Sequence, residues 1–286
     1  MALISQKAAI PRVINEWTAI KLEHLDAYLQ GYVTATKKWG ERYYIDGFAG
    51  CGDCILEESQ HPVAGSAWRA LRAVPRFSAY FFVEKHGPSA EHLRATIGQA
   101  GIANAYVFHG DSNQVITQQV LPMLSRKAPS FAFLDPTGLQ LHWETVVALA
   151  QHRDMSPYKM ELLILYPYDM AINRNLSNPA AQSALNRFFG GIDVWAQELE
   201  ASRGQGETAG QRRDRFVELY RARLRALGYS FVESFGPLCD GHKPKYYVIF
   251  AGDNATGAKI MNQVWSRLRA VPGQLGYQPI PRAKGG

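Results

Sequence analysis

The chain has 286 residues, and its 31 lysines and arginines against 25 aspartates and glutamates give a formal net charge of +6. Hydrophobic residues make up 47% and charged residues 20%, which supplies a buried core and excludes disordered and fibrous classes. Three cysteines cannot build a disulfide framework, and no apolar stretch approaches the roughly 20 residues that span a bilayer. We therefore expect a soluble cytoplasmic protein without an apolar leader segment. A charge this small permits a nucleic-acid partner but does not require one.

The first part of the chain alternates helical patterns with short apolar runs. An amphipathic helix is expected over residues 17–39, where apolar side chains recur at helical spacing, and residues 53–65 are expected to form a loop. The expected strands are residues 43–46, 79–83, 105–108, 130–134 and 160–166, and the expected helices between them are residues 65–74, 89–101, 113–124 and 143–151. Near-continuous apolar strands that alternate with helices predict a parallel sheet covered on both faces.

After residue 167 the pattern turns helical and then returns to strands. The expected helices are residues 180–189, 194–201, 211–227 and 256–271, and the expected strands, residues 230–235 and 245–250, flank a turn-rich segment typical of an antiparallel hairpin. The prediction is an α/β fold with a doubly wound, Rossmann-like, mostly parallel sheet of seven strands. The expected parts are an N-terminal helical segment (1–40), a core (41–169 and 229–271), a helical insertion (170–228) and a flexible tail (272–286).

Carboxylates stand at or just after four of the first five predicted strands. They are Asp46, Glu84, Asp111 and Asp135. In open parallel sheets the ligand lies beyond the carboxyl ends of the strands, so we expect these side chains on one rim, where Glu84 could accept ribose hydroxyls and Asp111 an adenine amine. The loop after Asp46 has glycines at 47, 50 and 52, which let backbone N–H groups approach a ligand. It lacks the G-x-G-x-x-G dinucleotide pattern, and an ordinary tight turn would use the same glycines.

The segment Asp135-Pro136-Thr137-Gly138 follows the fourth strand, beside the expected reactive end of a bound cofactor. In methyltransferases that act on exocyclic amines, the corresponding turn usually has Asp or Asn, two prolines and an aromatic residue. Thr137 and Gly138 replace the second proline and the aromatic residue, which leaves the acceptor atom open.

Two further groups of residues suggest other functions. Cys51, Cys54, Cys239 and His242 have the residue types of a zinc site, although buried free cysteines would also account for them. A basic helix over residues 211–227 would contact nucleic acid or simply face solvent, with Asp214 and Glu218 offsetting part of its charge. The candidate nucleic-acid contacts are Arg212, Arg213, Arg221, Arg223 and Arg225, and Arg215 lies among them.

On the basis of these residues, the chain resembles the three-Cys-motif partner protein family, whose fold is similar to that of class I S-adenosylmethionine-dependent methyltransferases. The segments that carry the resemblance are residues 43–50, Gly65-Ser66, residues 82–85, Gly110-Asp111, residues 133–138 with Trp143, residues 246–250, Thr256-Gly257 and residues 259–261. The resemblance covers about residues 20–270.

The resemblance implies S-adenosylmethionine as cofactor and, as partner, a three-Cys-motif protein of radical S-adenosylmethionine or iron–sulfur type. Asp46 to Gly50 would meet the amino acid moiety of the cofactor, and Asp135 is the candidate catalytic residue. The full set of expected cofactor contacts is Asp46, Gly47, Phe48, Ala49, Gly50, Gly65, Ser66, Glu84, Lys85, Asp111, Ser112, Asp135 and Pro136. The expected function is methyl transfer to an unidentified acceptor, with nucleic acid a candidate. A catalytically silent binding partner and a nicotinamide oxidoreductase are the alternatives.

Overall fold

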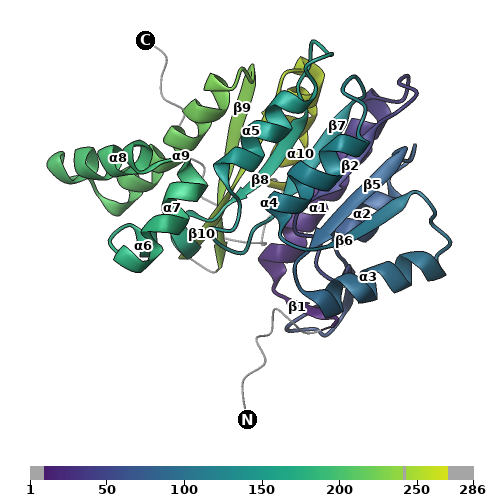
Figure 1. Cartoon of the computed structure of the whole chain (residues 1–286). Helices are drawn as coiled ribbons and strands as arrows, with labels where there is room; N and C mark the ends of the chain where they lie inside the picture. Colours follow the sequence, from purple (N-terminus) through teal and green to yellow (C-terminus); the bar gives the residue numbers. More distant parts are fainter. Residues whose placement is uncertain (1–9, 241–242, 270–286) are drawn as a thin grey trace.

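The computed structural model describes residues 10–240 and 243–269. Its centre is a seven-stranded sheet in the order β6-β5-β2-β7-β8-β10-β9 (Figure 1). The strands are β2 (Tyr43–Asp46), β5 (Ala79–Glu84), β6 (Ala105–His109), β7 (Ser130–Leu134), β8 (Glu161–Tyr166), β9 (Phe231–Asp240) and β10 (Lys243–Gly252). β10 alone runs in the opposite direction to the other six strands of this sheet. The predicted fold class, a doubly wound and mostly parallel α/β sheet, is confirmed.

Helices cover both faces of this sheet, because successive strand residues point to opposite sides. Phe131 and Phe133 belong to the core on one face, and Ala132 and Leu134 to the core on the other. The first face is covered by α1 (Glu16–Ala35), α2 (Ser66–Arg72), α3 (Gly87–Gln99) and α10 (Ala255–Arg269), and the second by α4 (Ser112–Val115), α5 (Trp143–His152), α7 (Gln182–Phe189), α8 (Ile192–Gly204) and α9 (Ala209–Ala226). The central strands are buried on both sides, which explains their continuous apolar sequences.

The segment expected to be a loop at residues 53–65 is the first correction. It contains β3 (Asp53–Leu56) and β4 (Pro62–Ala64), which form a small sheet with β1 (Arg12–Ile14) in the order β1-β3-β4. The strands have three or four residues each and β1 is about forty positions away, so no local periodicity marks them. This second sheet brings the start of the described chain to the main sheet.

Two other predicted elements differ in detail. The helix expected over residues 113–124 is divided into α4, a π-helical turn (Ile116–Val120) and a 3-10 turn (Leu121–Met123), the last of which contains Pro122. The turn expected at residues 236–241 is largely strand, because β9 continues to Asp240 with irregular pairing to β10. The hairpin itself is confirmed.

The chain between β8 and β9 is helical. Its remaining elements are a π-helical turn (Tyr168–Ile172), α6 (Asn173–Asn175) and a 3-10 turn (Pro179–Ala181). His242, the end of the helix expected to reach residue 271, and the tail 272–286 lie outside the described residues. Within the described ranges, no helix has both the length and the apolarity needed to cross a bilayer.

Candidate active site

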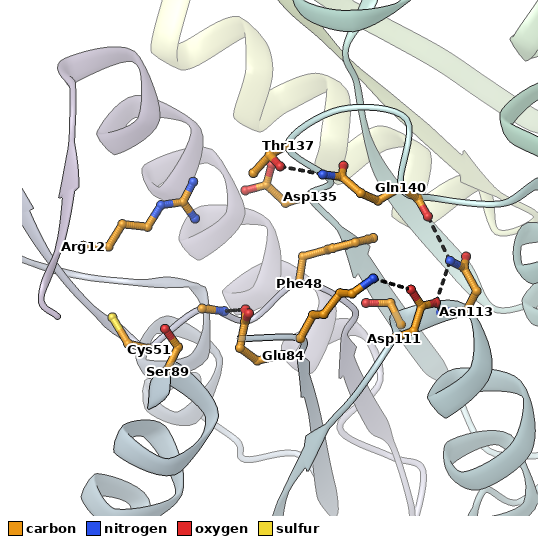
Figure 2. A pocket seen from close by; sticks show the side chains of 13 residues that line it. Arg12, Phe48, Cys51, Glu84, Ser89, Asp111, Asn113, Asp135, Thr137 and Gln140 are labelled. Carbon is orange, nitrogen blue, oxygen red and sulfur yellow. Dashed lines mark hydrogen bonds and ion pairs between the residues drawn. The ribbon is translucent and has the colours of Figure 1, made fainter. Parts of the chain in front are cut away.

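A cavity lies at the carboxyl ends of β2, β5, β6 and β7 (Figure 2). Seven of the residues expected at the site line it, namely Phe48, Gly50, Glu84, Lys85, Asp111, Ser112 and Asp135. Six lining residues were not predicted, namely Arg12, Cys51, Ser89, Asn113, Thr137 and Gln140. The strand-end carboxylates are therefore brought together as the parallel topology requires, with the exception of Asp46.

Glu84 joins the end of β5 to the glycine loop that follows β2. One carboxylate oxygen accepts the backbone N–H of Gly50 at 2.8 Å, and the other accepts the N–H of His86 at 2.7 Å. Gly50 has φ +64°, a left-handed conformation that favours glycine, and a side chain there would project into open space. The same cavity wall thus contains the Glu84 carboxylate and the half-buried backbone of Gly50, with no side chain in front of it.

Asp111 lies at the end of the next strand, on the opposite side of Glu84 from Asp135. Its carboxylate accepts the backbone N–H and the side-chain amide of Asn113, both at 3.0 Å, and pairs with Lys85 at 3.2 Å. Partial burial opposes ionisation, but the bonds from Asn113 and Lys85 outweigh it and lower the pKa of Asp111. The carboxylate is a charged acceptor at neutral pH.

Asp46 is fully buried and does not line the cavity. It shares a face of the sheet with Tyr44, whose hydroxyl donates to it, and it accepts the N–H of Phe48 at 3.1 Å. Burial raises its pKa to about 7, although a hydrogen bond from Ser66 at the start of α2 opposes the shift. Asp46 therefore stabilises the loop from inside the protein, through the backbone of Phe48, and does not face the cavity.

The other expected contacts outside the cavity lining also shape this loop. Gly47 donates to the carbonyl of Phe133 at 3.0 Å, Ala49 to Val83 at 3.0 Å, and Gly65 to Gly52 at 2.8 Å. A Cβ on Gly65 would lie 2.6 Å from the Gly52 carbonyl oxygen, so this close approach requires glycine. Pro136, the residue after Asp135, is buried.

Asp135 forms an ion pair with Lys21 of α1. The two side chains are 15% and 6% exposed. Lys21 was not predicted as a site residue, although the sequence held a signal: it lies one position before Leu22 and four before Leu25, both on the buried face of α1. A lysine at such a position either extends its ammonium to solvent or, when buried as here, needs a charged partner.

The loop after Asp135 is tied to the loop after β6. Gln140 donates to the Thr137 hydroxyl at 2.8 Å, and its backbone carbonyl accepts from the Asn113 amide at 2.8 Å. The oxygen of Asn113 in turn accepts the His142 N–H at 2.8 Å and the Thr145 hydroxyl at 2.9 Å. Asn113 therefore links the Asp111 and Asp135 sides of the cavity.

The arginines of α9 have partners inside the protein. Arg215 bonds Glu207 and Glu198, and Arg221 and Arg225 both pair with Glu218. The remaining arginines contact Ser202 (Arg212), Asp169 at 4.0 Å (Arg213) and the ring of Trp143 (Arg223). The contacts of Arg212, Arg213, Arg215 and Arg223 join α9 to its neighbours, whereas the Glu218 pairs lie within α9, where Arg221 also donates to the carbonyl of Val232 in β9.

The cysteines do not form a recognisable metal centre in the described part of the chain. Cys51, Cys54 and Cys239 are free thiols, and residues 10–240 and 243–269 contain no group of three metal-binding side chains. Burial raises the pKa of Cys54 to about 11, which keeps it a thiol.

The sequence matches no known family model and no curated protein. Among solved structures, protein LPL1258 from Legionella pneumophila has a TM-score of 0.53 at 12% identity, covering 91% of this chain and 96% of that one. Trm1 from Pyrococcus horikoshii, solved with S-adenosylmethionine, has a TM-score of 0.45 at 11% identity, with coverages of 86% and 57%. The METTL16 methyltransferase domain has a TM-score of 0.41 at 10% identity, with coverages of 79% and 65%.

The strand order, with its single reversed strand next to the edge, defines a methyltransferase-like Rossmann fold. The candidate site lies at the carboxyl edge of that sheet, where such folds bind ligands.

Proposed function

We propose that the protein binds S-adenosylmethionine in this cavity and transfers its methyl group to an acceptor held at Asp135. The observation that carries the proposal is that Glu84, Asp111 and Asp135, from three strand ends, line one cavity together with the half-buried backbone of Gly50. This combination suits a nucleoside with a charged amino acid chain.

The residues present fit the cofactor. Glu84 would hold the ribose, because each of its oxygens keeps a lone pair after accepting one backbone N–H. Asp111 and Ser112 would lie at the adenine, and Phe48 and Gly50 at the amino acid moiety. When bound, the cofactor supplies a methyl group already activated by its positively charged sulfur, so positioning is the main task of the protein.

Asp135 would orient the acceptor and receive its proton. In the structure its carboxylate is paired with Lys21, so an acceptor must share or replace that interaction. Lys21 would act as a positioning residue that fixes the carboxylate at the cavity wall.

We also propose membership of the three-Cys-motif partner protein family and an associated three-Cys-motif protein. What supports this is the ordered set of segments from residue 43 to residue 261, several of which meet at the cavity. Co-expression with a three-Cys-motif protein of radical S-adenosylmethionine or iron–sulfur type, followed by size-exclusion chromatography, tests the association. Separate elution of the two proteins would contradict it.

A catalytically silent binding partner is a second candidate. The observations that favour it are the Thr137-Gly138 sequence and the ion pair that Asp135 forms with Lys21. Binding of cofactor without any methylated product from the partner protein or cellular RNA, DNA and protein would establish this alternative.

Isothermal titration of the full chain with S-adenosylmethionine and S-adenosylhomocysteine tests the proposal. Binding of both should weaken in Glu84→Gln, whereas Asp135→Asn should keep binding and lose product formation. No binding of either compound, or tight binding of NAD in their place, would overturn it.

A further inference from the structure

An aromatic pair borders Asp135 on the side away from Glu84 and Asp111. The rings of Trp17, on α1, and Tyr246, on β10, stack with centroids 5.1 Å apart and planes 25° apart. The ammonium of Lys21, which pairs with Asp135, lies 5.8 Å from the Trp17 ring. Residues far apart in sequence thus place beside Asp135 the aromatic surface that Thr137 and Gly138 do not supply.

The same region contains two arginines without partners. Within residues 10–240 and 243–269, the guanidinium groups of Arg12 and Arg174 make no hydrogen bond and no ion pair, in contrast to those of α9, although the charge of Arg174 also opposes the rise that burial causes in the pKa of Asp169. Arg12 is half-buried in the cavity lining, and Figure 2 shows it extending toward Asp135. Arg174 is exposed on α6.

Both guanidinium groups lie near Tyr246. Burial and, to a smaller extent, the charge of Asp135 raise the pKa of Tyr246 to about 12, and the charges of Arg12 and Arg174 act against that rise. The hydroxyl of Tyr246 therefore lies within range of the charges of Asp135 and of both arginines. The indole N–H of Trp17 is also buried without a hydrogen-bond partner, so a donor is available at the same place.

We propose that the acceptor is single-stranded nucleic acid, with one base inserted beside Trp17 and Tyr246 and its flanking phosphates bound by Arg12 and Arg174. This rests on the proposed methyl transfer at Asp135. A half-buried guanidinium group at Arg12 and an exposed one at Arg174, neither in an ion pair, favour a polyanion, and aromatic side chains beside them are the usual means of holding an unstacked base. Asp135 is only 15% exposed, so a base must leave a duplex to reach it.

Methyl transfer to the base needs no reactant besides the cofactor and the base. A nitrogen of the base forms the new bond to the methyl carbon while the carbon–sulfur bond breaks, with its electron pair left on sulfur. Asp135 receives the displaced proton.

The test is fluorescence anisotropy of fluorescein-labelled single-stranded RNA and DNA 12-mers with the full chain, at several salt concentrations. The Arg12→Gln/Arg174→Gln double variant should lose about tenfold or more in affinity, and the slope of log affinity against log salt should fall by about 1.4 in magnitude. Arg76→Gln is the matched control, because Arg76 is exposed at the opposite edge of the sheet, before β5. Arg225→Gln tests whether the arginines of α9 contribute to nucleic-acid affinity.

Three results would overturn the proposal: no binding of either strand, an equal loss in Arg76→Gln or Arg225→Gln, or methylation of protein alone. A parallel titration with S-adenosylhomocysteine distinguishes failure of the acceptor proposal from failure of the proposed function. Oligonucleotide binding that fails while the cofactor analogue binds normally removes only the acceptor assignment. Retained analogue affinity in Arg174→Gln also shows that this variant is folded.

Discussion

Lys21 and Asp135 form an ion pair between the first helix and the loop after β7, although 114 positions separate them in sequence. Both side chains are largely buried, so each compensates a charge that water no longer solvates. This interaction ties the N-terminal helix to the proposed reaction centre.

Removal of Lys21 should therefore destabilise the protein through the charge it leaves behind. We expect Lys21→Met to lower the free energy of unfolding by about 2 kcal/mol, and Lys21→Met/Asp135→Asn to recover more than half of that loss. Urea denaturation of the two single variants and the double variant measures the coupling. If the single and double variants lose stability additively, the pair has no energetic role.

Glu84 should contribute to cofactor affinity through its charge. Glu84→Gln keeps the length of the side chain but replaces one of the two oxygens that accept from Gly50 and His86 by an NH2 group, and we expect it to weaken S-adenosylhomocysteine binding about 10- to 100-fold, the usual effect of a charged hydrogen bond. Isothermal titration measures this loss. Glu91→Gln, at an exposed position of α3, should bind like the unmodified protein.

Gly65 should tolerate no side chain, because its Cβ would press on the Gly52 backbone. Gly65→Ala should reduce stability by about 1–3 kcal/mol and weaken cofactor binding, since Gly52 belongs to the same loop as Gly50. Gly98→Ala is the control: nothing lies within 4 Å of its Cβ, and alanine should stabilise α3 by up to about 1 kcal/mol. Thermal unfolding that ranks the two variants in the opposite order would contradict the close packing.

Glu161 should make stability depend on pH. It is buried, accepts a hydrogen bond from Tyr28, and has its pKa raised by burial from 4.5 to about 7. The folded state therefore holds this proton more tightly than the unfolded state, and the contribution to stability is complete below about pH 4.5 and lost as the pH rises through 7.

In Glu161→Gln this part of the pH dependence should disappear. Between pH 5 and pH 8 the unmodified protein should lose on the order of 2 kcal/mol that the variant does not lose. Denaturation at both pH values tests it, with exposed Glu23→Gln as the control. An identical slope in Glu161→Gln would show that the carboxyl does not hold its proton.

The sequence alone determined the fold class and the edge of the sheet where the candidate site lies. Strands buried on both faces require continuous apolar runs, and parallel strands place their carboxyl ends together, so Glu84, Asp111 and Asp135 could be assigned to one rim. The same reasoning could not show that Asp46 faces α2, because both faces of its strand are buried and its direction depends on what covers each face.

Only the tertiary structure decided what surrounds Asp135 and which arginines are free to act. Lys21, Arg12 and Tyr246 reach this region from α1, the small sheet and β10, and such contacts arise from helix and sheet packing that leaves no periodic trace in the sequence. The arginines of α9 show the converse. Their density in the sequence indicated a basic surface. In the structure α9 packs beside acidic residues such as Glu198 and Glu207, which form ion pairs with Arg215. Pairing is favoured because a guanidinium in an ion pair on a packed helix is more stable than an isolated one.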